Sequence, residues 1–342
     1  ELARSEGLFD TLAGWAVRHA GGSARRLFGL VYAIGILVTV FMSNDATAVV
    51  LTPAVHAAAK RAGARPLPYL FACALVANAA SFVLPVSNPA NLVVFGAGMP
   101  PLVHWIRLFA LPSIAAIAST WLLLGWIFRA ELRDPIADDP RIPPLSRTGR
   151  LAAWGVVGVA LALLGASAAG LPLGWPTIIA SGIAIAAVQA AKREAPWPLL
   201  RHVSWSVLPL VGGLFILVAG LGETGVIAAL TATLHDAAQA SPRAAAWGAG
   251  AVVGFGSNLM NNLPAGLVAG TAANAGALPD AVRSAIAVGI DVGPNLSITG
   301  SLATILWLVA LRREGEHVSA LEFLRVGAIV MPVSLALALA CL

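Results

Sequence analysis

The sequence predicts an all-α polytopic membrane protein made of inverted-topology repeats, each with a re-entrant hairpin and a broken transmembrane helix. Of its 342 residues 58% are hydrophobic and 11% are charged, and the mean hydropathy is +0.85. About one quarter of the residues in a typical soluble domain are charged, so this composition argues against a soluble domain. Apolar segments of the roughly 20 residues that a helical span needs recur along the chain, without the alternation of a transmembrane barrel. A sequence pattern that occurs twice predicts the repeats.

The first copy begins with a mixed segment, residues 1–26, that we expect to lie in the membrane interface. Residues 27–59 follow, and Asp45 is their only formally charged residue. This stretch is too long for one straight span and carries Ser43, Asn44 and Asp45 at its centre, which predicts a hairpin with a buried tip. A carboxylate at bilayer depth is costly unless it meets water, a partner or a proton, so Asp45 is a candidate functional residue.

A broken helix and a plain span complete this copy. Residues 67–98 are interrupted in the middle by Asn78, Ser81, Pro85, Ser87, Asn88, Pro89 and Asn91. Breaks at this depth are tolerated only where the backbone lines a cavity. Residues 106–128 form the plain span, and a charged linker, 129–150, follows. We therefore expect a first repeat over 1–128, a cytoplasmic linker over 129–150 and a second repeat over 151–342.

The second repeat begins with spans at 151–170, 175–191 and 205–221. An interfacial segment at 222–240, a hairpin at 244–275, a broken helix at 281–311 and a plain span at 323–342 then repeat the earlier order. Three spans precede this copy whereas only a few residues precede the first. That difference predicts further helices before residue 1; the alternative is an asymmetric architecture.

Aligning the copies places polar residues opposite one another. The pairs are Asn44 with Asn261, Asp45 with Asn262, Asn78 with Asp291, Ser87 with Gly300, Asn88 with Ser301, and Asn91 with Thr304. The predicted substrate site consists of Ser43, Asn44, Ser87, Asn88, Asn91, Asn261, Asn262, Gly300, Ser301 and Thr304, with Asp45 and Asp291 as proton-coupling residues. The structural alternative is that these amides and hydroxyls only bond neighbouring helices and that both aspartates only cap helices.

Basic residues predict the orientation. Most of the 21 lysines and arginines fall in loops on one face if each hairpin returns to its own side and each broken helix crosses once, whereas Arg107, Arg243 and Arg283 lie on the other. Such a bias marks the first face as cytoplasmic. The two hairpins then open to opposite sides, an arrangement that many secondary transporters build around a midplane site.

The sequence gives little support to a metal-binding protein, an ATP-hydrolysing enzyme or a nucleic-acid-binding protein. The two cysteines, Cys73 and Cys341, form no metal-binding motif, so we expect them to pack in the protein. We expect no metal and no cofactor. The six histidines lie near span ends, as interface anchors do. No Walker loop is present, which argues against an ATP-hydrolysing enzyme, and the basic residues form no nucleic-acid-binding face.

Four motifs together, FMSNDATAVVLTP, LPVSNPANLVVF, NLMNNLPAGLVAG and DVGPNLSITGSLATILWL, resemble ArsB-type arsenite permeases. These belong to the ion transporter superfamily, which also holds divalent-anion, citrate and NhaD-type sodium/proton carriers. The resemblance implies export of arsenite and antimonite across the bacterial inner membrane coupled to proton entry, in some members with a soluble arsenite-stimulated ATPase subunit. One departure is Ser-Asn-Pro at 87–89, where the superfamily's anion carriers have Ser-Asn-Thr.

The expected function is therefore a secondary transporter for a neutral trihydroxide, with the lipid bilayer, protons and arsenite or antimonite as its partners. The predicted site offers amides, hydroxyls and helix ends but no lysine or arginine to hold a full anionic charge. The alternatives are a carrier for an inorganic or carboxylate anion bound at helix N-termini, a sodium/proton antiporter, and a channel-like pore.

Overall fold

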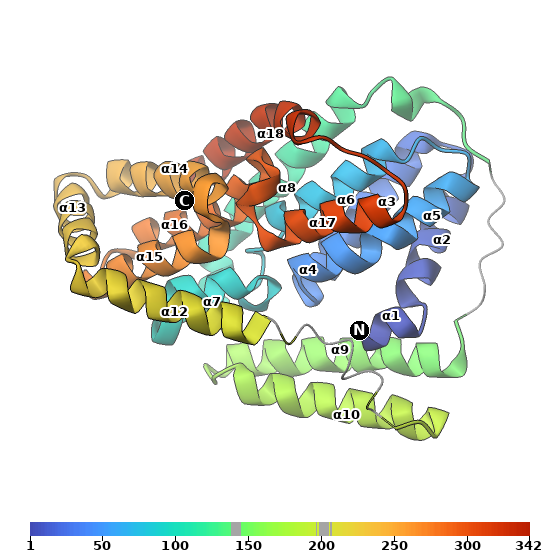
Figure 1. Ribbon diagram of the computed structural model, residues 1–342, viewed down its shortest axis with the longest axis horizontal. Helices are drawn as coiled ribbons and strands as arrows, with labels where there is room; N and C mark the ends of the chain where they lie inside the picture. The colour runs from blue at the N-terminus through green and yellow to red at the C-terminus, as the bar shows by residue number, and fades with distance from the viewer. Residues whose placement is uncertain (138–144, 196, 198–204, 206) are drawn as a thin grey trace.

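The computed structural model describes residues 1–137, 145–195, 197, 205 and 207–342 (Figure 1). In these residues the regular structure is helical, apart from one isolated bridge between Ser23 and Pro135. Within the described ranges, five helices are long and apolar enough to cross a membrane: α3 (Ala24–Phe41), α8 (Leu102–Ile127), α9 (Arg147–Ala168), α10 (Gly174–Lys192) and α18 (Ala320–Ala340). The predicted all-α polytopic class is confirmed.

The first part of the chain has the predicted hairpin and break. After α1 (Leu2–Ser5) and α2 (Leu8–Ala20), helix α3 stops at Phe41 and the chain re-enters helical structure as α4 (Asn44–Ala46), the π-helical η1 (Thr47–Leu51) and α5 (Thr52–Arg61). Helix α6 (Leu67–Ala79) then stops before η2 (Pro85–Ser87), α7 (Pro89–Phe95) and η3 (Gly96–Gly98). Helix α8 and η4 (Glu131–Arg133) follow.

The last part has the same order of elements. Helix α12 (Val207–Glu223) bends by 76° into α13 (Val226–Ala240), where the interfacial segment was expected. The hairpin is α14 (Pro242–Met260) and α15 (Asn262–Ala275). The break separates α16 (Asp280–Val292) from α17 (Leu302–Arg313) through η5 (Gly293–Leu296) and η6 (Ile298–Gly300). The middle of the predicted linker, 138–144, and parts of 196–206 lie outside the described residues, so those predictions stay untested there.

Two hydrophobic cores exchange their broken helices. The core around α2, α3, α5 and α6 also contains Trp307 of α17, whose indole N–H donates to the Leu70 carbonyl over 3.1 Å. The core around α14, α15 and α16 contains Val94 and Phe95 of α7. Each broken helix thus begins in one core and ends in the other. The two breaks consequently lie between the cores.

Glycines allow α14 and α16 to pack at very short range. Gly250 and Gly254 in α14 face Gly289 and Gly293, four residues apart on each side. A methyl group on Gly289 would overlap the Gly250 carbonyl oxygen and lie 3.1 Å from the Gly254 nitrogen. Paired small residues at this spacing let membrane helices approach until their backbones touch. This contact sets the position of the second break relative to its hairpin.

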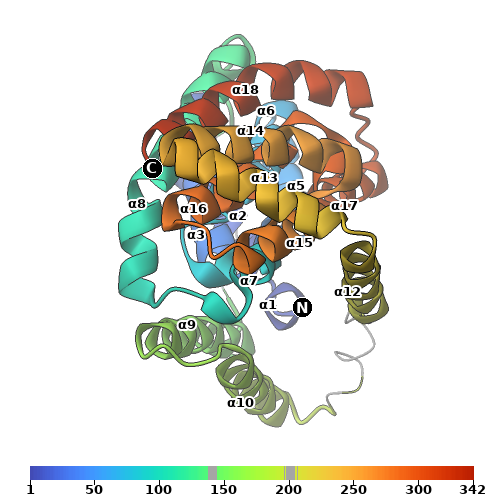
Figure 2. The same ribbon diagram turned by 90° about the vertical axis from the view of Figure 1, so that its left-hand side faces the viewer.

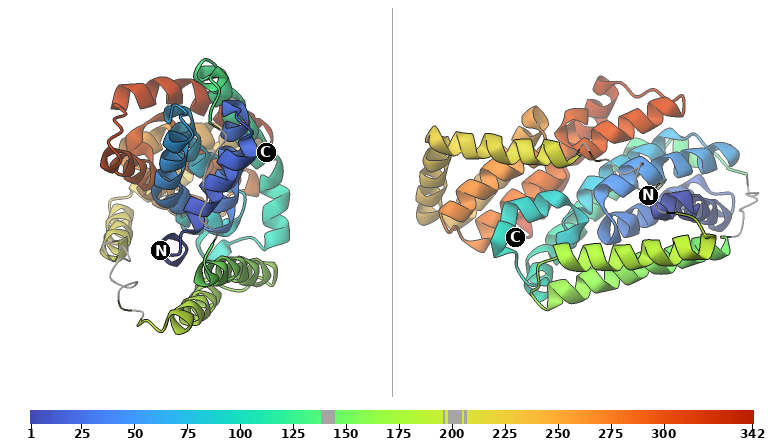
Figure 3. Two further views of the ribbon diagram at one scale, coloured as in Figure 1. Left: turned by 90° about the vertical axis from the view of Figure 1, so that its right-hand side faces the viewer. Right: turned by 60° about the horizontal axis from the view of Figure 1, so that its bottom comes forward.

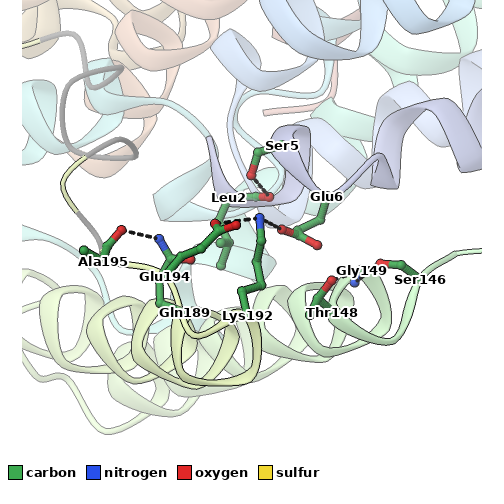
Figure 4. Close-up of polar contacts among 10 residues, drawn as sticks. All are labelled: Leu2, Ser5, Glu6, Ser146, Thr148, Gly149, Gln189, Lys192, Glu194 and Ala195. Carbon is green, nitrogen blue, oxygen red and sulfur yellow. Dashed lines mark hydrogen bonds and ion pairs between the residues drawn. The ribbon is translucent and has the colours of Figure 1, made fainter.

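Helices α9 and α10 pack on each other and lie to one side of the other helices (Figures 2 and 3). Lys192, at the end of α10, joins them to the N-terminal segment, because its ammonium group lies 3.0 Å from Glu6 and 3.2 Å from Glu194 (Figure 4). The Glu6 side chain is only 5% exposed. Burial opposes its ionisation, but hydrogen bonds from Thr148 and Lys192 outweigh burial and lower the pKa of Glu6.

Candidate functional site

The two helix breaks form where the local sequence cannot continue a helix. Pro85 and Pro89 bracket the first break, and Gly293 and Pro294 open the second. After each break a new helix begins in the same way, with a capping side chain on the residue that precedes it. The side-chain oxygen Oδ1 of Asn88 accepts from the backbone N–H of Ala90 over 3.0 Å, and the Ser301 hydroxyl accepts from the backbone N–H of Thr304 over 3.1 Å. Capping satisfies backbone donors that would otherwise be unpaired at the helix start.

Hydrogen bonds cross between the breaks in a reciprocal pattern. The Asn88 amide donates to Oδ1 of Asp291. At the other contact the Ser301 hydroxyl donates to Oδ1 of Asn78 over 3.4 Å, and the Asn78 amide reaches Thr304 Oγ1 at 3.4 Å. Because Asn78 matches Asp291 and Asn88 matches Ser301 in the sequence alignment, the same link is made twice with its two ends exchanged. All five side chains are buried.

Asp291 is the most deeply buried acid at this junction. It is completely buried, and in the described part of the chain its Oδ2 has no hydrogen-bond partner. Leaving a charged oxygen unpaired in an apolar interior costs several kcal/mol. A proton on this oxygen would remove the charge and with it most of that cost.

The first hairpin tip reaches the same region. The Ser43 hydroxyl accepts from the Ala46 amide over 3.1 Å, and the buried Asn44 side chain accepts from the amide of Asp45 over 2.9 Å. The Asp45 side chain is half-buried, and its short helix α4 packs against α6 and α17. Ser87 in the first break donates to the Val40 carbonyl over 3.0 Å, which ties this break to the arm that precedes the tip.

The second hairpin tip contacts the second break. Asn261 has a φ of +76°, which is rare and strained for a residue with a side chain. Its amide group lies 3.3 Å from the Thr299 carbonyl, and the next residue, Asn262, is buried. A methyl group on Gly300 would lie 2.6 Å from Cα of Pro294 and 2.7 Å from Oδ1 of Asn258. Only glycine therefore fits at this point.

The structure adds residues that the sequence-based site omitted. Asn78 donates to Asn295 over 2.9 Å, and Asn295 donates to the Leu75 carbonyl over 3.1 Å. Asn258 donates to the Gly293 carbonyl over 3.0 Å and accepts from the Ser297 hydroxyl over 2.8 Å. Asn78 was recognisable as the position opposite Asp291, and Asn258 as a polar residue one turn before the second tip.

Two remaining site predictions have defined surroundings. Asn91 lies buried in the first turn of α7 and donates to the Ser81 carbonyl over 2.9 Å, so it holds the two sides of its own break together. Cys73 is buried in α6 and Cys341 is half-buried beyond the end of α18. The described residues contain no group of three or more metal-ligating side chains.

Comparison with known proteins identifies the family. The CitMHS family of citrate transporters matches residues 1–289. The chain belongs to this family. It is also 30% identical to the arsenical pump membrane protein of Escherichia coli K12, over 96% of this chain and 80% of that protein. The putative arsenical pump membrane protein of Bacillus subtilis 168 is 25% identical over 99% of this chain and 83% of its own length.

A solved structure shares the fold of this CitMHS protein. The YdaH transporter of Alcanivorax borkumensis, described as having an unusual topology, superposes with a TM-score of 0.57 at 17% identity, over 99% of this chain and 84% of that one. At this identity the likeness concerns the fold alone. Together these findings make the protein a multi-pass membrane transporter of the ion transporter superfamily.

Proposed function

We propose that this CitMHS protein exports arsenite and antimonite, as neutral trihydroxides, across the bacterial inner membrane in exchange for protons. The observation that carries the proposal is the junction of the two breaks, where buried amides and hydroxyls from both halves meet. Segments 40–59, 78–95, 244–282 and 284–311 contain no lysine or arginine. A neutral polyhydroxy solute needs hydrogen-bond partners rather than a cationic clamp. The relatives named arsenical pump membrane proteins support the same substrate class.

Asp45 and Asp291 would carry the protons. In this proposal each half supplies one acid and one amide, because Asp45 is matched by Asn262 and Asp291 by Asn78. Loss of the proton from Asp291 would change the acceptor of the Asn88 side-chain amide from a neutral carboxyl group to a carboxylate. Asn88 also caps α7, so loading of Asp291 would act on the start of that half-helix. This gives a physical route from proton binding to the backbone of the break.

The repeat organisation belongs to the same proposal. Residues 1–128 and 151–342 would be inverted repeats, with 129–150 as a cytoplasmic linker, and the exchange of α7 and α17 between the two cores supports this arrangement. Relative movement of the two cores would then expose the junction to either side. A soluble arsenite-stimulated ATPase subunit is a further proposed partner, and the transport step itself would be no enzymatic reaction.

Transport in everted membrane vesicles tests the substrate. The vesicles come from a host that lacks its own arsenite exporter, and arsenite accumulation is measured with an imposed pH gradient. We expect uphill accumulation that a protonophore abolishes and that excess antimonite, but not citrate or sulfate, inhibits. Accumulation that persists without a pH gradient would contradict proton exchange.

A carboxylate or inorganic anion is the second candidate substrate. The match to citrate transporters over residues 1–289 favours it, and helix α17 begins directly after Ser301 at the junction, where a helix N-terminus could attract an anion. In the vesicle assay this candidate predicts competition by citrate or sulfate. Dependence on sodium would indicate the sodium/proton antiporter, and absence of counterflow would indicate a pore.

A further inference from the structure

A buried histidine joins the base of the first hairpin to the turn between α17 and α18. His56 of α5 has a side chain only 4% exposed. Its Nε2 lies 3.0 Å from Oε1 of Glu316, and its Nδ1 lies 3.6 Å from Oε2 of Glu314. Lys60, one turn further along α5, lies 3.3 Å from the same oxygen of Glu316. We call His56, Lys60, Glu314 and Glu316 the His56 cluster.

The geometry of the His56 cluster depends on the protonation of the imidazole. A neutral ring has one N–H, and a protonated ring has two. Since each ring nitrogen faces a different carboxylate, only the protonated ring can donate to both Glu314 and Glu316. Hydrogen bonds from His56 and Lys60 lower the pKa of Glu316, so this carboxylate remains ionised where histidines titrate. Histidine is the side chain that changes charge between about pH 5 and 8.

We propose that the His56 cluster is a proton-operated latch between the first hairpin and the α17–α18 turn. When His56 is protonated, it bridges the two glutamates and holds α5 against the turn. When His56 loses its proton, it keeps one N–H and can donate to only one of the two glutamates, and Lys60 contacts Glu316 alone. The hairpin then separates from the turn more readily. The latch acts in the middle and last turn of α5, away from the hairpin tip at residues 43–45, and is therefore distinct from the substrate junction.

Among the charged and titratable residues around α5, His56 is the histidine buried inside the contact. Those on the elements packed against α5, or lining the cavity of about 220 Å³ beside Glu314, are Arg4, Asp10, Arg18, His19, Arg61, Arg312 and Arg313. Helix α6 and η1 carry none. Of these side chains only His19 is another histidine, and its Nδ1 lies 2.9 Å from the Trp15 carbonyl of its own helix. His317 is the other nearby histidine and follows Glu316 in the turn.

The equivalent contact of the second hairpin is built differently. Helix α15 is joined to the end of α7 by Asn274, whose amide donates to the Val94 carbonyl over 3.1 Å. Arg283 donates to Asn274 over 3.1 Å and lies over the Phe95 ring. These contacts keep their charge because arginine does not titrate. His104 and Asp280 form an ion pair near this end, but both side chains are nearly half exposed and are screened by solvent.

The latch is tested by hydrogen–deuterium exchange of the full chain in lipid nanodiscs at about pH 5.5 and pH 8, corrected for the intrinsic pH dependence of exchange. We expect amides of α5 and of the α17–α18 turn to be about tenfold more protected at the lower pH. In His56→Gln the low-pH protection should fall to the level at pH 8. His104→Gln is the matched control and should keep the full pH response.

Glu316→Gln provides a second variant in case His56→Gln does not fold. It keeps the buried histidine but removes an anionic acceptor, so the pH response at α5 should shrink. A purely structural role for His56 would lower protection equally at both pH values. Equal protection of the unmodified chain at both pH values, or an unchanged pH response in the folded variants, would overturn the latch.

Discussion

Replacing Gly289 by alanine tests the close packing that positions the second break. The new methyl group would overlap the Gly250 carbonyl oxygen, and the three nearest atoms all belong to the α14 backbone, so there is no flexible side chain that could move away. Overpacking of this kind costs about 1–3 kcal/mol, whereas alanine in place of glycine gains about 0.5–1 kcal/mol of helix propensity. We therefore expect a net loss of about 1–2 kcal/mol and a shift of the break.

Gly256→Ala is the matched control, since it lies in α14 and a methyl group there would meet nothing within 4 Å. This variant should be as stable as the unmodified protein or slightly more stable. The assay is thermal stability in detergent by fluorescence-detected size exclusion, followed by arsenite transport in vesicles. If Gly289→Ala is as stable and as active as Gly256→Ala, the packing argument is refuted.

Three further predictions concern thiols, topology and the N-terminal ion pair. Replacing Cys73 and Cys341 together by alanine should leave arsenite resistance largely intact, and loss of transport in a folded double variant would instead support thiolate binding of As(III). Accessibility tags in the 129–150 linker and at the C-terminus should report opposite sides of the membrane with the linker cytoplasmic, and a periplasmic linker would contradict the inverted repeats. The lowered pKa of Glu6 means that its contact with Lys192 stabilises the protein above about pH 4.5 and is lost as the pH falls through the lowered value. Lys192→Met should therefore reduce thermal stability at pH 7 and have less effect near pH 3.

Local chemistry made much of the fold predictable. Proline removes a backbone donor from a helix, and asparagine favours helix caps, so the breaks near Pro85 and Pro294 and the tips near Asn44 and Asn261 could be located from the sequence. The contacts between the two breaks were harder to predict. Sequence matching pairs residues that are equivalent, such as Asn88 and Ser301, whereas the contacts join residues that are not equivalent, such as Asn88 and Asp291.

Long-range pairing explains the other omissions. His56 looked like one of six histidines near span ends, because its partner Glu316 lies 260 positions away. Asn295 looked like part of a break, although its side chain connects Asn78 to the backbone of α6. Such contacts depend on how the two cores are placed against each other. No spacing within either segment contains that information.

The most direct measurement of the central claim is arsenite transport by Asp45→Asn and Asp291→Asn, with Asp280→Asn as a surface control. Asparagine keeps nearly the same shape but cannot carry a proton. Both variants should reach the membrane, and at least one should lose proton-driven export while retaining arsenite exchange at equal pH on both sides. If both single variants and the double variant still drive arsenite uphill with an unchanged pH dependence, these two carboxyl groups do not couple transport to protons.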